Sequence, residues 1–96
     1  MRITELEKNA IIEAIKKTDP NGKVWLFGSR TDNAKKGGDI DIAVLSGIIN
    51  NDAMLKIQVR RYIYDRIGEQ RIDIVTSSDG REAFFRLAVQ EGIELI

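Results

Sequence analysis

Apolar and polar residues recur along the chain with two different periods, and these periods predict its helices and strands. Apolar residues spaced three and four positions apart predict a first helix from about residue 5 to residue 17. Thr4 and Glu7 fit a capping box at its start, and Asp19-Pro20-Asn21-Gly22 is a turn sequence that ends it. Two further helices are expected over residues 54–67, ended by Gly68, and over residues 83–90.

Three short runs predict strands. Residues 24–27 are continuously apolar and stop at Gly28, which is typical of a central strand. Residues 39–45 and 71–76 begin by alternating apolar with polar side chains, so each predicted strand has two unlike faces. A short helical turn and a loop are expected over residues 29–38, and a short strand or tail after Gly92. This order of elements indicates a single α/β or α+β domain.

Two details of the helices follow from the same patterns. The apolar residues of 54–67 are scattered broadly enough to predict two buried sides for that helix. Asp79 with Glu82 suggests a cap for the third helix.

Composition narrows the class of protein. The 96 residues are 43% hydrophobic and 31% charged, which is typical of one small globular domain. Fifteen basic residues balance fifteen acidic ones, so no direct binding of nucleic acid or of a membrane surface is expected from bulk charge. No apolar run reaches the length of a membrane span, and the N-terminus lacks the apolar segment of a signal peptide. We therefore expect a cytoplasmic protein.

Cysteine and histidine are both absent, which excludes disulfides, thiolate chemistry and histidine-dependent sites. Any metal ion must then be held by oxygen ligands, which suit Mg²⁺ or Mn²⁺. Asp39 and Asp41 lie two positions apart and would project from the same face of their strand. Asp73 interrupts the apolar pattern of the next predicted strand and joins them if the two strands are neighbours. Three such carboxylates would be able to hold two Mg²⁺ ions.

Gly28, Ser29 and Arg30 directly follow the first predicted strand and suggest a phosphate-binding turn. Glycine lets the backbone turn sharply and come close to a ligand. Ser29 would begin a helical turn whose free N–H groups favour phosphate, and Arg30 would add a bidentate contact. Phosphate binding beside an acidic two-metal site is what nucleotidyl or phosphoryl transfer requires.

Each feature also has a simpler interpretation. Aspartates on an alternating strand are commonly solvent-exposed, Ser29 fits a plain helix N-cap, and Arg30 fits a surface arginine. Trp25 and Phe27 are more typical of a core than of a base-stacking surface. The coincidence of the Gly-Ser pair, the spaced aspartates and a distal aspartate favours the metal site over these alternatives.

Together, Gly28-Ser29-Arg30, Gly38-Asp39-Ile40-Asp41 and Asp73 resemble the motif of the nucleotidyltransferases of the DNA polymerase β superfamily. The short chain resembles the minimal nucleotidyltransferases, or MNT proteins. The resemblance implies one minimal domain over residues 1–96 with the polymerase β-like palm fold, a small mixed β-sheet with flanking helices. Gly38 departs from the family pattern, which often has serine before the spaced aspartates; a hydroxyl is lost but no ligand.

Carried over to this chain, the resemblance implies Asp39, Asp41 and Asp73 as catalytic residues that bind two Mg²⁺ ions, with Mn²⁺ as a possible substitute. Gly28, Ser29 and Arg30 would bind the nucleotide. The implied reaction moves a nucleoside monophosphate, with ATP as the expected donor of AMP, onto an acceptor hydroxyl and releases pyrophosphate.

The resemblance also implies a partner. No acceptor-binding domain follows in this chain, so a partner protein or a second copy in a homo-oligomer is expected to complete the site. MNT proteins are commonly paired with HEPN-domain toxins, and act as antitoxins that attach AMP to a tyrosine of the toxin. The alternative is a non-catalytic module that neutralises a toxin by binding it and keeps only a relict nucleotide site. Modification of a small molecule such as an aminoglycoside is a third, less favoured possibility.

Overall fold

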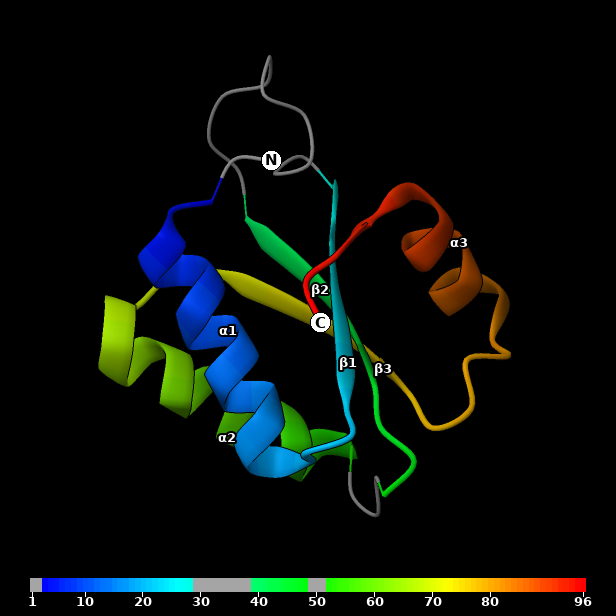
Figure 1. The fold of residues 1–96 in the computed structure, drawn as a ribbon, viewed down its shortest axis with the longest axis horizontal. Coiled ribbons are helices and arrows are strands. Elements are labelled where there is room, and N and C mark those ends of the chain that lie inside the picture. The colour runs from blue at the N-terminus through cyan, green and yellow to red at the C-terminus, as the bar shows by residue number, and fades with distance from the viewer. Residues whose placement is uncertain (1–2, 29–38, 49–51) are drawn as a thin grey trace.

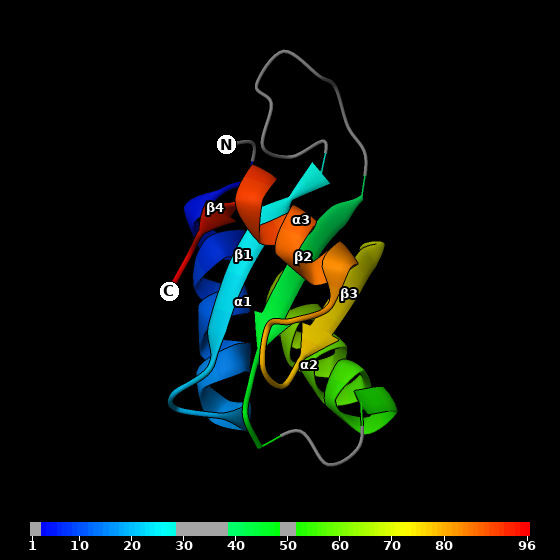
Figure 2. The same cartoon turned by 90° about the vertical axis from the view of Figure 1, so that its right-hand side faces the viewer.

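The computed structural model describes residues 3–28, 39–48 and 52–96, which form a sheet with helices on both of its faces (Figure 1). In chain order the elements are α1 (Glu5–Thr18), β1 (Lys23–Phe27), β2 (Ile40–Leu45), α2 (Asp52–Ile67), β3 (Ile72–Ser77), α3 (Ala83–Glu91) and β4 (Ile93–Glu94). Helices α1 and α2 lie together against one face, and α3 lies against the other, as the turned view in Figure 2 shows. The predicted fold class, a mixed sheet with flanking helices, is confirmed.

The sheet has the strand order β3-β2-β1-β4. Strand β2 pairs in parallel with β3 and antiparallel with β1, and β4 adds antiparallel to the other side of β1. Strand β1 is therefore an inner strand, as its continuous apolar sequence predicted. This register places the end of β1 beside the beginnings of β2 and β3.

Hydrogen bonds fasten both ends of α1. The Glu7 N–H donates to Thr4 Oγ1 (3.0 Å) and the Thr4 N–H donates to Glu7 Oε1 (2.8 Å), so the predicted capping box is confirmed. Gln70 Nε2 donates to Glu7 Oε2 (3.1 Å), which ties this end to the segment before β3. At the other end, the buried carboxylate of Asp19 accepts a hydrogen bond from Ser46 Oγ at 2.7 Å, so the turn after α1 is joined to the end of β2.

Helix α2 buries one side only, so the prediction of two buried sides was wrong. Its buried residues Leu55, Val59 and Ile63 are spaced by four, which forms a single stripe. Met54 and Ile57 are about half exposed. Isolated apolar residues on a solvent-facing side are common in folded proteins. In this helix their positions produced the sequence pattern of a second buried side.

Helix α3 begins without the predicted cap. Glu82 is the N-cap residue but makes no side-chain capping bond; its carboxylate accepts a hydrogen bond from Ser77 Oγ (2.8 Å) instead. Asp79 accepts a hydrogen bond from the Arg81 N–H (3.0 Å), which shapes a turn before the helix. That turn contains Gly80 at φ +76°, so the backbone at Asp79 forms a turn and the helix begins only after Glu82.

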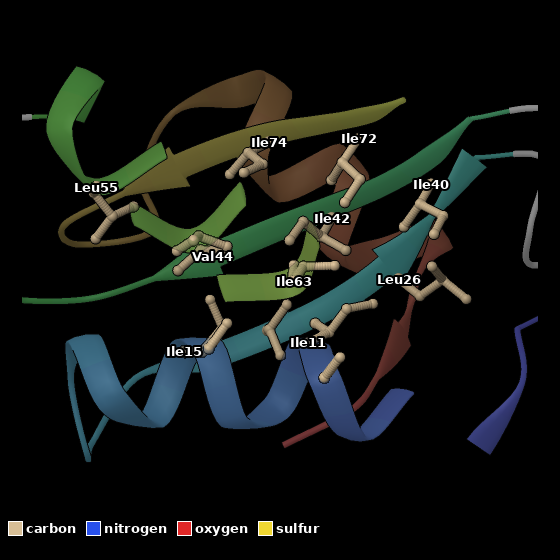
Figure 3. Close-up of a cluster of buried hydrophobic side chains, with 14 residues drawn as sticks. Ile11, Ile15, Leu26, Ile40, Ile42, Val44, Leu55, Ile63, Ile72 and Ile74 are labelled. Atoms are coloured by element: carbon tan, nitrogen blue, oxygen red, sulfur yellow. The ribbon is translucent and has the colours of Figure 1, made fainter. Parts of the chain in front are cut away.

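The larger hydrophobic core lies between α1, α2 and one face of the sheet (Figure 3). Its aliphatic side chains come from both helices and from alternate positions of the three longer strands. Fully burying a side chain of this kind contributes about 1.5–3 kcal/mol before the entropy of folding is counted. A smaller core, in which Ala43, Phe85 and Ala88 are buried, lies under α3 on the opposite face. Within the described parts of the chain, no helix combines the length and apolar character that crossing a membrane would need.

Candidate active site

Strands β2 and β3 bring acidic side chains together at one end of the α3-facing side of the sheet, beside the end of β1. Strand register pairs Phe27 of β1 with Asp41 of β2, and Asp41 with Asp73 of β3. Directly paired residues on neighbouring strands project from the same face, so the side chains of these three residues form a row across the sheet. The sequence-based expectation that Asp73 comes beside Asp41 therefore agrees with the strand pairing.

Asp39 lies just before β2 and completes a group of acidic side chains, which we call the acidic row: Asp39, Asp41 and Asp73. Its carboxylate is paired with a cation, because Arg71 Nε lies 3.3 Å from Asp39 Oδ2. The backbone supports this pairing, since the Ile40 N–H donates to the Arg71 carbonyl at 3.1 Å.

The acidic row changes the protonation of its central member. Partial burial, the charge of Asp73, a hydrogen bond shared with Asp73 and the charge of Asp39 together raise the pKa of Asp41 to about 6, from an ordinary value of 3.8. Neighbouring carboxylates raise one another's pKa when too little positive charge is available to neutralise them. Without an added cation, the raised pKa favours a proton on Asp41.

Gly28 makes room for Asp41 at the end of β1. Its φ of +74° falls in the left-handed region, and a Cβ atom at this position would lie 2.2 Å from Asp41 Oδ2. Only glycine fits both the backbone conformation and the close approach. Ser29 and Arg30, the other two residues of the predicted phosphate-binding turn, and Gly38 lie outside the described residues.

The acidic row fits a divalent cation by its chemistry. Oxygen ligands are the ones that Mg²⁺ and Mn²⁺ prefer. The pKa of Asp41 is raised first by burial and then by the charges of Asp73 and Asp39, and a bound cation would neutralise those charges. Across residues 3–28, 39–48 and 52–96, no group of three or more acidic side chains is already arranged around a common metal position. Asp39 is instead paired with Arg71. Binding of a cation would therefore require the row to rearrange.

Two residues near the acidic row were missed by sequence reasoning. Arg71 could have been found, because Arg71-Ile72-Asp73 repeats the spacing of Asp39-Ile40-Asp41 on the neighbouring strand. Phe84 of α3 is 59% exposed, and its ring meets the ring of Phe27 edge-on with centroids 6.3 Å apart. Its place depends on how α3 packs on the sheet, which no local pattern encodes.

A separate pocket of about 410 Å³ lies under α3, where Trp25, Leu45 and Phe85 form part of its lining. Leu45 is four positions along β2 from Asp41, or about 13 Å. Trp25 and Phe85 meet edge-on there with ring centroids 5.9 Å apart. Trp25 thus packs in the smaller core, as its sequence context predicted, and the pocket is distinct from the acidic row.

Comparison with known proteins connects this geometry to a family. The sequence profile described as polymerase beta nucleotidyltransferase matches residues 9–96. No curated protein sequence matches the chain. A chain from the structure of a tri-AMPylated Shewanella oneidensis HEPN toxin in complex with MNT antitoxin is similar with a TM-score of 0.68 and 23% identity, over 98% of this chain and 72% of that chain. A chain from the MntA–HpeT toxin–antitoxin structure, a mutant with two aspartate-to-glutamate substitutions, has a TM-score of 0.68 and 22% identity, over 93% of this chain and 71% of that one.

Proposed function

Because the chain belongs to the polymerase beta nucleotidyltransferase family, we propose that it is a Mg²⁺-dependent enzyme that transfers AMP from ATP to an acceptor hydroxyl. In this proposal residues 1–96 act as one minimal nucleotidyltransferase domain. The observation that carries the proposal is the acidic row, in which strand pairing places Asp41 beside Asp73, and burial together with the neighbouring carboxylates raises the pKa of Asp41.

The members of the acidic row take different roles. Asp39 and Asp41 would hold Mg²⁺ through carboxylate oxygens, and Asp73 would add the third carboxylate. Bound divalent ions supply charge neutralisation for the triphosphate and lower the pKa of the attacking hydroxyl. Asp73 is more exposed than Asp41 and lies on an edge strand, so it is the carboxylate best placed to meet an incoming acceptor.

Nucleotide binding is assigned to the turn after β1. Gly28 already brings the backbone against the Asp41 carboxylate, so a phosphate held at this turn would lie close to the acidic row. Ser29 and Arg30 would contact the triphosphate through backbone N–H groups and a guanidinium, which are the usual partners of phosphate oxygens.

The proposed reaction balances without another reagent. The acceptor oxygen forms a bond to the α-phosphorus of ATP, and the bond from that phosphorus to the bridging oxygen of pyrophosphate breaks. The acceptor proton passes to Asp73 and then to solvent, while the electron pair of the broken bond leaves with pyrophosphate. The products are an adenylylated acceptor and pyrophosphate.

The proposed acceptor is a tyrosine hydroxyl of a HEPN-domain toxin, and the chain acts as its antitoxin. Two structures with this fold come from toxin–antitoxin pairs, and in one of them a tri-AMPylated HEPN toxin is in complex with an MNT antitoxin. A phenol hydroxyl suits the acidic row, because it ionises more readily than an aliphatic hydroxyl and needs less help from a base.

A label-transfer assay tests the proposal. The chain is incubated with a HEPN-domain protein, Mg²⁺ and ATP labelled at the α-phosphate, and the products are examined by mass spectrometry. We expect AMP attached to a tyrosine of the HEPN protein, no transfer by an Asp41→Asn variant, and normal transfer by Asp65→Asn, which removes an exposed aspartate from α2.

Toxin neutralisation separates catalysis from binding. If Asp41→Asn forms the complex but no longer neutralises the toxin, the enzyme is the active antitoxin. If Asp41→Asn neutralises as well as the wild type and neither protein transfers label, the chain is a binding module with a relict site, and the proposed activity is wrong.

A further inference from the structure

A positive charge is built into the acidic row by the pairing of β2 with β3. The parallel register matches Ile40 with Ile72 and Asp41 with Asp73, so the residues that precede these strands, Asp39 and Arg71, also lie beside each other. The hydrogen bond from the Ile40 N–H to the Arg71 carbonyl (3.1 Å) fixes the two backbones at this point. Arg71 Nε then lies 3.3 Å from Asp39 Oδ2.

We propose that Arg71 is the resident counter-cation of Asp39, and that a divalent metal ion must displace its guanidinium before Asp39 can act as a ligand. This inference rests on the proposed function, because it concerns the metal site of the same aspartates. It assigns a role to a residue outside the acidic row: Arg71 positions Asp39 without metal and lowers the affinity of the site for metal alone.

The exposure of the pair makes this exchange feasible. The Arg71 side chain is 79% exposed and the Asp39 side chain 37%, so the ion pair is strongly solvated and weak. A carboxylate that keeps this partner has one oxygen committed to the guanidinium, and a divalent ion approaching it also meets a positive charge. Both effects oppose metal binding, and both disappear when the guanidinium swings away into solvent.

The exchange also explains why the acidic row is not arranged around a metal position. A planar guanidinium draws a carboxylate oxygen toward its N–H groups, whereas a spherical cation draws several oxygens toward one point. With Arg71 as its partner, Asp39 has one oxygen engaged by a guanidinium, and among the described residues the three carboxylates form no group around a common metal position.

Metal titration of four proteins tests the proposal. Mn²⁺ binding to the metal-free chain is followed by electron paramagnetic resonance for the wild type, Arg71→Gln, Arg71→Lys and Arg81→Gln. Arg81 is the matched control: it is also exposed and also paired with an aspartate, Asp79, beyond the far end of β3, which spans about 20 Å.

We expect Arg71→Gln to bind Mn²⁺ about two- to fivefold more tightly than the wild type, because one weak ion pair no longer competes. Arg71→Lys keeps the charge and is expected to stay within about twofold of the wild type. Arg81→Gln should match the wild type. Thermal unfolding without metal should hardly differ among the four, so that a change in affinity is not a change in folding.

A second measurement needs no variant. In ¹⁵N-labelled wild-type protein, the Nε–H signal of Arg71 should shift as Mg²⁺ is added, and the corresponding signal of Arg81 should not. The proposed role of Arg71 as counter-cation would be overturned if Arg71→Gln bound Mn²⁺ equally or more weakly than the wild type. It would also be overturned if the Arg71 Nε–H signal did not shift when Mg²⁺ is added.

Failure of this inference is distinguishable from failure of the proposed function. If the wild type binds Mg²⁺ with ATP but Arg71→Gln binds Mn²⁺ no more tightly than the wild type does, the displacement proposal is wrong and the nucleotide site survives. If neither the wild type nor Arg71→Gln binds metal, alone or with ATP, both proposals are wrong.

Discussion

The two faces of the sheet are built from the same strands but differ in what covers them and in the chemistry they carry. Toward α1 and α2, alternate strand residues are aliphatic and at most 6% exposed: Val24, Leu26, Ile40, Ile42, Val44, Ile72 and Ile74. Toward the shorter α3, the intervening positions include Asp41 and Asp73 and the half-buried rings of Trp25 and Phe27. Because successive side chains of a strand point to opposite faces, the same strand can carry core side chains on one face and reactive side chains on the other.

This difference explains how a small domain tolerates clustered carboxylates. Like charges close together oppose folding unless a cation or a proton neutralises them. Without metal, Arg71 neutralises Asp39, and the raised pKa of Asp41 favours a proton there. The continuous apolar face supplies the stability that offsets the acidic row, so substitutions on the two faces should have different consequences.

A large loss of stability is expected when a side chain buried against the apolar face is shortened. Ile63→Ala removes a fully buried side chain of α2 and should lower the free energy of unfolding by about 2–5 kcal/mol, as measured by urea denaturation. Ile57→Ala on the same helix is the control; its side chain is 49% exposed, and the expected change is within about 0.5 kcal/mol. Similar losses in both variants would contradict the one-sided burial of α2.

Gly28→Ala should damage the site and the fold together. A Cβ atom there would collide with the Asp41 carboxylate, and the left-handed backbone alone costs about 1–2 kcal/mol in a residue with a side chain. We expect loss of Mg²⁺-dependent ATP binding in calorimetry and a lowered melting temperature. Gly47→Ala is the matched control, because a Cβ atom at Gly47 would meet nothing within 4 Å. Wild-type ATP binding by Gly28→Ala would show that the close approach to Asp41 is unimportant.

Asp41→Asn should act in the opposite direction on stability. The folded-state pKa of Asp41 is about 6, above its ordinary 3.8, so its contribution to stability is full below about pH 3.8 and is lost as the pH rises through about 6. Without metal, the asparagine variant should therefore be more stable than the wild type above that range, by less than about 1 kcal/mol because the group is partly solvated. Urea denaturation of both proteins across this pH range checks the sign; a variant that is less stable at high pH would contradict it.

Phe84→Ala should have the smallest effect on stability. Phe84 is 59% exposed, so the expected change in the free energy of unfolding is within about 0.5 kcal/mol. Its neighbour Phe85 is only 3% exposed, and Phe85→Ala should cost about 3–5 kcal/mol by the same urea measurement. Equal losses would mean that α3 packs on the sheet through a different side.

Local patterns predicted most of the fold. The capping box at Thr4, the continuous apolar sequence of β1 and the alternation of β2 and β3 each depend on neighbouring residues, and each agrees with the structure. Two predictions were wrong. The segment at Asp79 forms a turn instead of a helix cap, and the second apolar side of α2 faces solvent instead of a core.

The strand pairing of the acidic row was predicted only conditionally, on β2 and β3 being neighbours. Their parallel register brings Asp41 beside Asp73, and it also brings Arg71 to Asp39. Spacing along one strand indicates which side chains share a face, whereas register between strands decides which side chains meet. The ion pair of Arg71 therefore could not be deduced from either strand alone.

The most direct test of the central claim, that the acidic row is a metal-dependent nucleotide site, is calorimetric titration of ATP into the purified chain with and without Mg²⁺, at a pH well above the pKa of Asp41. We expect saturable binding that requires Mg²⁺, is lost in Asp41→Asn and persists in Asp65→Asn. Binding that is independent of Mg²⁺, or that is equally strong in a folded Asp41→Asn variant, would contradict the claim.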